Sequence, residues 1–130
     1  MEIQPREIGN EEYVSQYGSR QTGQPVFRDS PRPVDRDGLS GVFGRVTAAE
    51  ARRPVRQAGS PTEDDGVRHG QVGDLRERGF VVSHTPSQRN TRHVSIRYPG
   101  VWDEKVTGMF NACFGAPQWY EEPKEGGQDE

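Results

Sequence analysis

The alternation of apolar and polar residues is clearest in the run HVSIR at residues 93–97. Val94 and Ile96 fall on one side of an extended chain, and polar residues fall on the other. This period of two predicts a β-strand with one buried face. The shorter apolar runs at residues 80–83 and 39–43 predict two further strands.

A helical period replaces this alternation near the C-terminal end. Apolar side chains recur there at spacings of 3, 4, 7 and 8 over residues 102–114, which predicts an amphipathic helix; they are Val106, Met109, Phe110, Cys113 and Phe114. Two shorter helices are also predicted. Thr47 and Glu50 have the spacing of a capping box, and Asp74 begins a single turn that Gly79 ends.

These elements predict an α+β fold with a small mixed or antiparallel sheet, one amphipathic C-terminal helix and two short helices. Residues 1–24 show no sustained period and predict a flexible acidic arm, whereas residues 25–115 form the single domain. Residues 116–130 predict an acidic tail. Within the domain, residues 25–28 are a candidate strand, and residues 57–66 have the composition of a linker.

Composition and charge limit the possible functions. Apolar residues make up 29% of the chain and charged residues 28%, so the core must be small. The acidic ends leave residues 25–115 with a net charge of +3, a weak preference for anions. We do not expect nucleic acid as a partner, because this excess is low and aromatic residues are not interleaved with the arginines. Fifteen of the seventeen basic residues are Arg, which suits planar anions or reflects a GC-rich genome.

The single cysteine and the apolar runs suggest no special chemistry. Cys113 lies on the buried face of the predicted helix, so we expect a structural thiol and no disulfide or metal cluster. No apolar run approaches the roughly 20 residues that a membrane span requires, and the N-terminus lacks the apolar stretch of a signal peptide. We therefore expect a cytoplasmic protein without membrane contact.

Polar residues near the predicted strands are the candidates for a site. His93 and Ser95 share a strand face that is either solvated or holds a polar ligand. The loop at residues 84–92 is longer than a hairpin requires. Arg89 and Arg92 in this loop either bind an anion or belong to an ordinary solvated turn.

Two further residues have the same two interpretations. Arg28 is either part of a surface ion pair or an anion clamp, and His69 either precedes a strand in a turn or contacts a ligand. The chain has neither a Gly-rich phosphate loop nor the spacing of paired catalytic carboxylates or metal-ligating histidines.

Short motifs in a fixed order carry a resemblance to a known family. They are F-R, G-L-S, H-G-x-V, G-F-V-V and H-V-S-I, followed by a helix with Met and Phe. In this order residues 25–114 resemble the small Tse2-like bacterial toxins, which have the ADP-ribosyltransferase fold. The resemblance implies a cleft for nicotinamide adenine dinucleotide (NAD) between two small sheets. It implies that Arg28 grips the diphosphate and that Ser40 or His93 orients the nicotinamide ribose, with Ser95 on the bordering strand.

Two hypotheses follow, and no Glu takes the position of the usual transferase acid. In the first, the chain is a toxin-like enzyme that uses NAD and has a cognate immunity or antitoxin protein. Its catalytic candidates are His93, Ser95 and Ser40, and its cofactor-binding candidates are Arg28, Arg89, Arg92 and His69. In the second, the chain is a non-enzymatic interaction module, such as an immunity, antitoxin or accessory protein.

Overall fold

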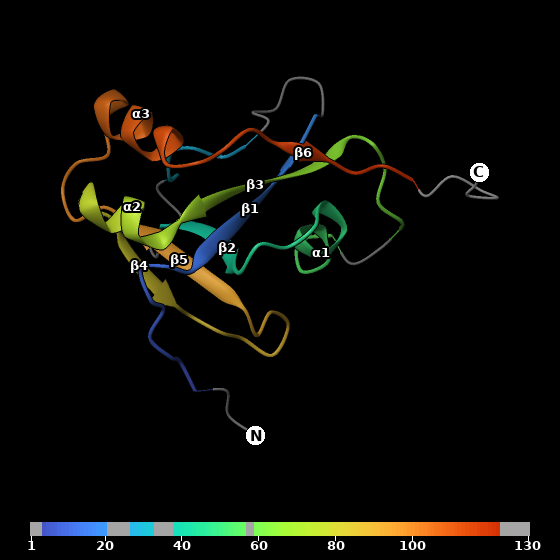
Figure 1. Cartoon of the computed structure of the whole chain (residues 1–130), viewed down its shortest axis with the longest axis horizontal. Helices are drawn as coiled ribbons and strands as arrows, with labels where there is room; N and C mark the ends of the chain where they lie inside the picture. Colours follow the sequence, from blue (N-terminus) through green and yellow to red (C-terminus); the bar gives the residue numbers. More distant parts are fainter. Residues whose placement is uncertain (1–3, 21–26, 33–37, 57–58, 123–130) are drawn as a thin grey trace.

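The protein is a small α+β fold with a six-stranded antiparallel sheet. The computed structural model describes residues 4–20, 27–32, 38–56 and 59–122. Within these residues the strands lie in the order β4-β5-β2-β1-β3-β6 (Figure 1). Their bounds are β1 Tyr13–Ser19, β2 Leu39–Phe43, β3 Asp65–Gln71, β4 Val81–His84, β5 His93–Arg97 and β6 Gln118–Trp119. The helices are α1 Ala48–Arg52, α2 Val72–Glu77 and α3 Glu104–Ala112.

The strands β2, β4 and β5 confirm the alternation in the sequence. The strands β4 and β5 form an antiparallel hairpin, and β5 pairs on its other side with β2. Val94 and Ile96 are fully buried, as the period of two predicts. The predicted capping box is also present, because the side chain of Thr47 accepts from the backbone N–H of Glu50 and the Glu50 carboxylate accepts in return.

The predicted flexible arm is wrong for residues 13–19, which form β1 in the interior of the sheet. This strand pairs with β3 over its whole length and with β2 at its start. Its inward positions include Ser15 and Gln16, which are only 1% and 3% exposed. Polar residues at buried positions hide the alternation that would have identified a strand, so the domain begins well before residue 25.

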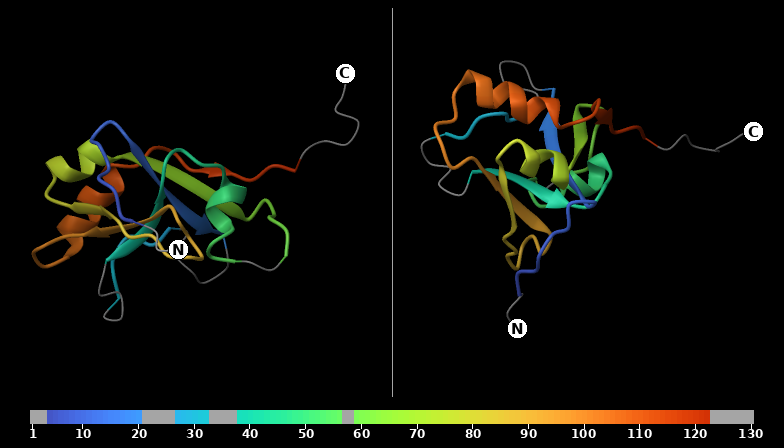
Figure 2. Two further views of the ribbon diagram at one scale, coloured as in Figure 1. Left: turned by 90° about the horizontal axis from the view of Figure 1, so that it is seen from below. Right: turned by 60° about the vertical axis from the view of Figure 1, so that its left-hand side comes forward.

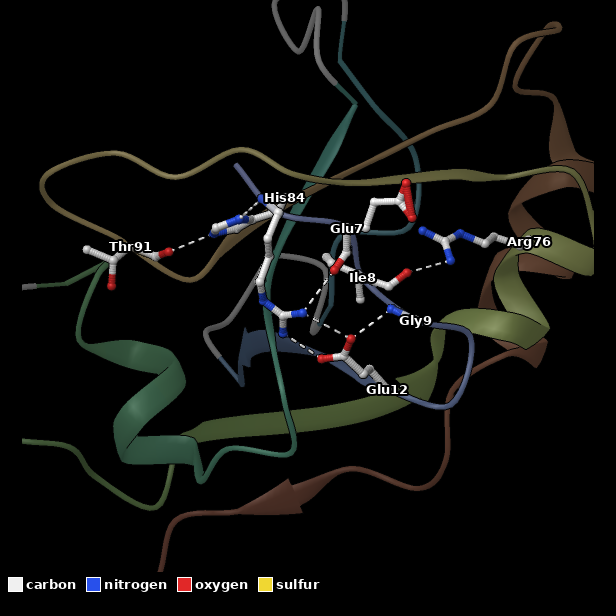
Figure 3. A network of polar contacts seen from close by, with 8 residues as sticks. Glu7, Ile8, Gly9, Glu12, Arg76, His84 and Thr91 are labelled. Carbon is white, nitrogen blue, oxygen red and sulfur yellow. Dashed lines mark hydrogen bonds and ion pairs between the residues drawn. The ribbon is translucent and has the colours of Figure 1, made fainter. Parts of the chain in front are cut away.

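The segment before β1 is anchored by polar contacts (Figure 3). The backbone N–H of Arg6 donates to Nδ1 of His84 at 2.9 Å, and Nε2 of that imidazole donates to the carbonyl of Thr91 at 2.8 Å. The Arg6 guanidinium pairs with Glu12, which also accepts from the backbone N–H of Gly9. The Arg6 guanidinium and the Gly9 N–H hold the pKa of the Glu12 carboxyl below its usual value. Residues 4–12 are therefore part of the domain.

Other predicted boundaries also differ from those in the structure. The expected linker ends before Asp65, because residues 65 and 66 already belong to β3, and His69 lies within that strand and not in a turn. The strand β6 lies within the predicted tail and pairs with β3. Phe27 and Arg28 belong to no strand, and residues 25–26 lie outside the described part. Gly79 has the predicted left-handed conformation, with φ of 93°.

The two faces of the sheet are covered differently. One, which we name the α2–α3 face, carries the larger core; its members include Val14, Leu39, Leu75, Val94, Ile96 and Phe110. The other, the α1 face, carries a smaller cluster of Val42, Val46, Ala48, Ala51 and Val67. Figure 1 and the left-hand view of Figure 2 show α2 and α3 close together, with α1 apart from them. None of the helices in the described part is long and apolar enough to cross a membrane.

Candidate functional site

A cleft opens where β1 and β2 separate. The two strands are paired only at Val14 with Phe43 and at Ser15 with Val42. Beyond this point consecutive residues of both strands, 15–19 and 38–42, line one cavity of about 520 Å³. Side chains of a paired strand alternate between two faces, so a cavity lined by consecutive residues lies along the separated strand edges. This volume falls within the usual range of small-molecule sites.

The cavity is rich in guanidinium groups. Arg28 and Arg32 come from the segment before β2, Arg56 follows α1, and Arg89 belongs to the β4–β5 loop. Among the described residues that line it, none is Asp or Glu. Guanidinium groups bind phosphates and carboxylates, so these side chains suit an anionic ligand.

A chain of hydrogen bonds crosses one wall of the cavity. The Ser40 Oγ lies 3.0 Å from Nε2 of His93, and Nδ1 of that ring lies 2.7 Å from Oγ1 and 3.1 Å from the carbonyl oxygen of Thr85. Thr85 Oγ1 lies 2.8 Å from the Ser95 Oγ. A carbonyl oxygen only accepts, so its contact favours the tautomer that has the proton on Nδ1 and in which Nε2 accepts from Ser40.

The strand geometry explains this placement of His93. It alternates with Val94, which is buried on the α2–α3 face, so its ring lies on the α1 face. Register brings Ser40 opposite Ser95 and places His93 two residues away along β5, on the same face. The predicted polar row is therefore real, but only His93 and Ser40 line the cavity. Ser95 is 4% exposed and reaches them through Thr85.

A buried pair holds the segment that carries Arg28. The side chain of Gln16 donates to the backbone carbonyl of Arg28 and accepts from Nε of Arg68 at 2.7 Å. Arg68 is 8% exposed, and its guanidinium carbon lies 5.0 Å from the centroid of Phe27 and 4.5 Å from that of Phe114. Burial lowers the pKa of Arg68 to about 10, which still leaves it charged at neutral pH.

Two predicted cofactor-binding residues lie outside the cavity. His69 is on the α1 face in the same cross-strand row as His93, but Ser15 and Val42 stand between them. Three strand spacings separate the two histidines by about 14 Å, and Nε2 of His69 contacts the Val46 carbonyl at 2.8 Å. The guanidinium of Arg92 lies 5.1 Å from the centroid of Phe43.

Several lining or supporting residues were missed in the sequence. Thr85, Arg32 and Arg56 stand in polar loops whose composition gave no reason to choose them. Gln16 lay in the predicted arm. Tyr17, which also lines the cavity, donates a hydrogen bond to Asp65, and burial together with this carboxylate raises its pKa, so its phenol stays neutral.

The described residues offer neither a cluster of metal ligands nor a reactive thiol. Within the described residues no group of three or more His, Cys, Asp or Glu side chains is placed to hold a metal ion. Cys113 is buried in the larger core, and burial raises the pKa of its thiol. A raised pKa keeps the sulfur protonated and weakly nucleophilic.

Comparisons with known proteins found no relative of this chain. No protein-family model matches the sequence, and no curated protein and no solved structure shows significant similarity to it. The functional interpretation therefore depends on the cleft and its side chains alone.

Proposed function

We propose that the chain is a small toxin-like protein that binds NAD in the cleft between β1 and β2. The observation that carries this proposal is the joint presence of Arg28, Arg89, Ser40 and His93 around one cavity whose described lining residues include no carboxylate. A dinucleotide has a diphosphate for guanidinium groups and ribose hydroxyls for smaller polar side chains. Both kinds of group are available within the 520 Å³.

In this proposal, different side chains of the cleft contact different parts of NAD. Arg28 and Arg89 bind the diphosphate, because planar guanidinium groups bind phosphate oxygens in pairs. Ser40 and His93 contact the nicotinamide ribose. The reaction that such a cleft supports is transfer of the ADP-ribosyl group with release of nicotinamide. The arginines would stabilise the phosphates of the ADP-ribosyl group throughout this step.

Thermal unfolding with millimolar NAD tests the binding. We expect NAD to raise the melting temperature, because a ligand that binds only the folded state stabilises it. Arg28→Ala, Arg89→Ala and His93→Ala should each weaken binding about 10- to 100-fold, the loss expected for one charge-assisted contact. Arg92→Ala is the matched control, since it removes an arginine of the same loop from outside the cavity and should leave the shift unchanged.

Activity requires a separate measurement. The wild-type chain should release nicotinamide from NAD and inhibit growth when expressed, and both effects should disappear in Arg28→Ala and His93→Ala. A wild-type chain that shows no thermal shift at millimolar NAD and no effect on growth would contradict the proposal.

One alternative is favoured by the lack of a carboxylate among the described residues that line the cavity. Without an acidic side chain to stabilise a developing positive charge on the ribose, the cleft would bind a ligand and catalyse nothing. The chain would then act as an interaction module that recognises a partner, such as a cognate immunity or antitoxin protein. Binding of NAD without nicotinamide release or growth inhibition would support this second hypothesis.

A further inference from the structure

We propose that Ser40 is a nucleophile that His93 activates as a general base. The evidence is the 3.0 Å contact between Ser40 Oγ and His93 Nε2 on the wall of the cavity. A serine hydroxyl is weakly nucleophilic until a neighbouring base takes its proton, and an imidazole at hydrogen-bond distance is the usual base. This inference adds a covalent step to the proposed function of the cleft. Its first test uses a fluorophosphonate probe and requires no NAD.

The orientation of the imidazole favours this role over an idle polar surface. Nδ1 of His93 lies 3.1 Å from the Thr85 carbonyl and 2.7 Å from its hydroxyl, and the carbonyl contact favours the tautomer in which the Nε2 lone pair is directed at Ser40. This is the sequence of nucleophile, base and orienting acceptor that nucleophilic catalysis requires. Thr85 is the positioning residue, and its hydroxyl is held in turn by the buried Ser95.

Two other serines that line the cavity bond to backbone groups instead. The Ser15 hydroxyl donates to the Gly44 carbonyl and accepts from the N–H of Val46, and the Ser87 hydroxyl accepts from the N–H of Asn90. In the described part of the chain, Ser40 alone among the lining serines contacts an imidazole. The site therefore selects one hydroxyl, which is exposed to the cavity.

The substrate class follows from the charges around this hydroxyl. The arginines of the cavity bind an anionic group, so the electrophile must carry phosphate near its reacting atom. For NAD, the bond between C1′ of the ribose and the nicotinamide nitrogen breaks, and nicotinamide leaves with the electron pair. A bond forms between Ser40 Oγ and C1′, and the hydroxyl proton moves to His93 and then to solvent. The product is a chain modified on Ser40.

A fluorophosphonate probe tests the nucleophile without NAD. Ser40 Oγ would attack phosphorus, fluoride would leave, and His93 would take the hydroxyl proton. We expect one adduct per wild-type chain, mapped to Ser40 by peptide mass spectrometry. Ser40→Ala should give none, His93→Asn should react about 100-fold more slowly, the usual contribution of a general base, and Ser60→Ala, an exposed serine outside the cavity, should react at the wild-type rate.

Incubation with NAD and intact-mass measurement form the second arm. A mass gain of one ADP-ribosyl group, mapped to Ser40 and lost in Ser40→Ala, would support both proposals. A Ser40 adduct with the fluorophosphonate but no thermal shift with NAD would support the nucleophile and overturn NAD binding. A thermal shift with NAD, but no Ser40 adduct from either reagent, would overturn the nucleophile and leave NAD binding intact. An adduct rate that His93→Asn does not change in a folded variant would also overturn it.

Discussion

The two faces of the sheet differ, because one carries most of the apolar core and the other carries polar side chains of the cleft. The α2–α3 face buries twelve residues in one cluster, with the rings of Phe80, Trp102 and Phe110 in mutual contact. The α1 face buries a cluster of only five, and next to it His93 and Ser40 line the cleft. Apolar burial supplies most of the folding free energy, so a core concentrated on one face lets the other hold polar side chains.

The largest effect should follow from a cavity in the α2–α3 face. Phe110 is fully buried and contacts Phe80, Trp102 and Phe114. Phe110→Ala should lower the free energy of unfolding by about 3–5 kcal/mol, measured by urea denaturation. The matched change on the other face, Ser40→Ala, should cost less than about 0.5 kcal/mol. Equal losses in the two variants would contradict the division between the faces.

An intermediate effect is expected where the two halves of the sheet join. Ser15 accepts from the backbone N–H of Val46 at 3.1 Å and donates to the carbonyl of Gly44. Ser15→Ala leaves that buried N–H without a partner, which should cost about 1–3 kcal/mol. The exposed Ser60→Ala is the control. A melting temperature of Ser15→Ala equal to that of the control would show that the junction does not depend on this hydroxyl.

The smallest effect should come from replacing the buried polar pair of the α2–α3 face as a unit. Arg68→Met alone should cost about 1–3 kcal/mol, because the Gln16 side-chain oxygen loses its donor. The double change of Gln16→Met with Arg68→Met should cost about 1 kcal/mol, because apolar pairs replace buried polar ones at little cost and the remaining loss is the Gln16 bond to the Arg28 carbonyl. A double variant as unstable as the sum of the singles would indicate that the pair itself stabilises the fold.

The local elements were largely predictable from the sequence. Val94 and Ile96 alternate with polar residues, and the Thr47 capping box begins a helix, because both signals depend on residues close in the chain. Strand β1 was not predicted, because the buried side chains of Ser15 and Gln16 form their hydrogen bonds with residues far along the chain. Their burial depends on partners that no local pattern reveals.

The candidate site was predictable in part. Arg28, Ser40, Arg89 and His93 were proposed from the sequence, and the structure places all four around one cavity. Their shared location could not follow from spacing, since β2, the β4–β5 loop and the segment before β2 meet only through the sheet order. Their roles toward NAD stay predictions.

By itself, the sequence determined the buried face of β5 and the start of α1, because backbone geometry turns a period of two or a capping residue into structure within a few residues. The tertiary structure alone decided which polar side chains share the cleft. It did so because β1 and β2 stay paired at only two positions and then diverge. Long-range pairing therefore created the cavity, and the register of β5 against β2 brought the imidazole of His93 to the hydroxyl of Ser40.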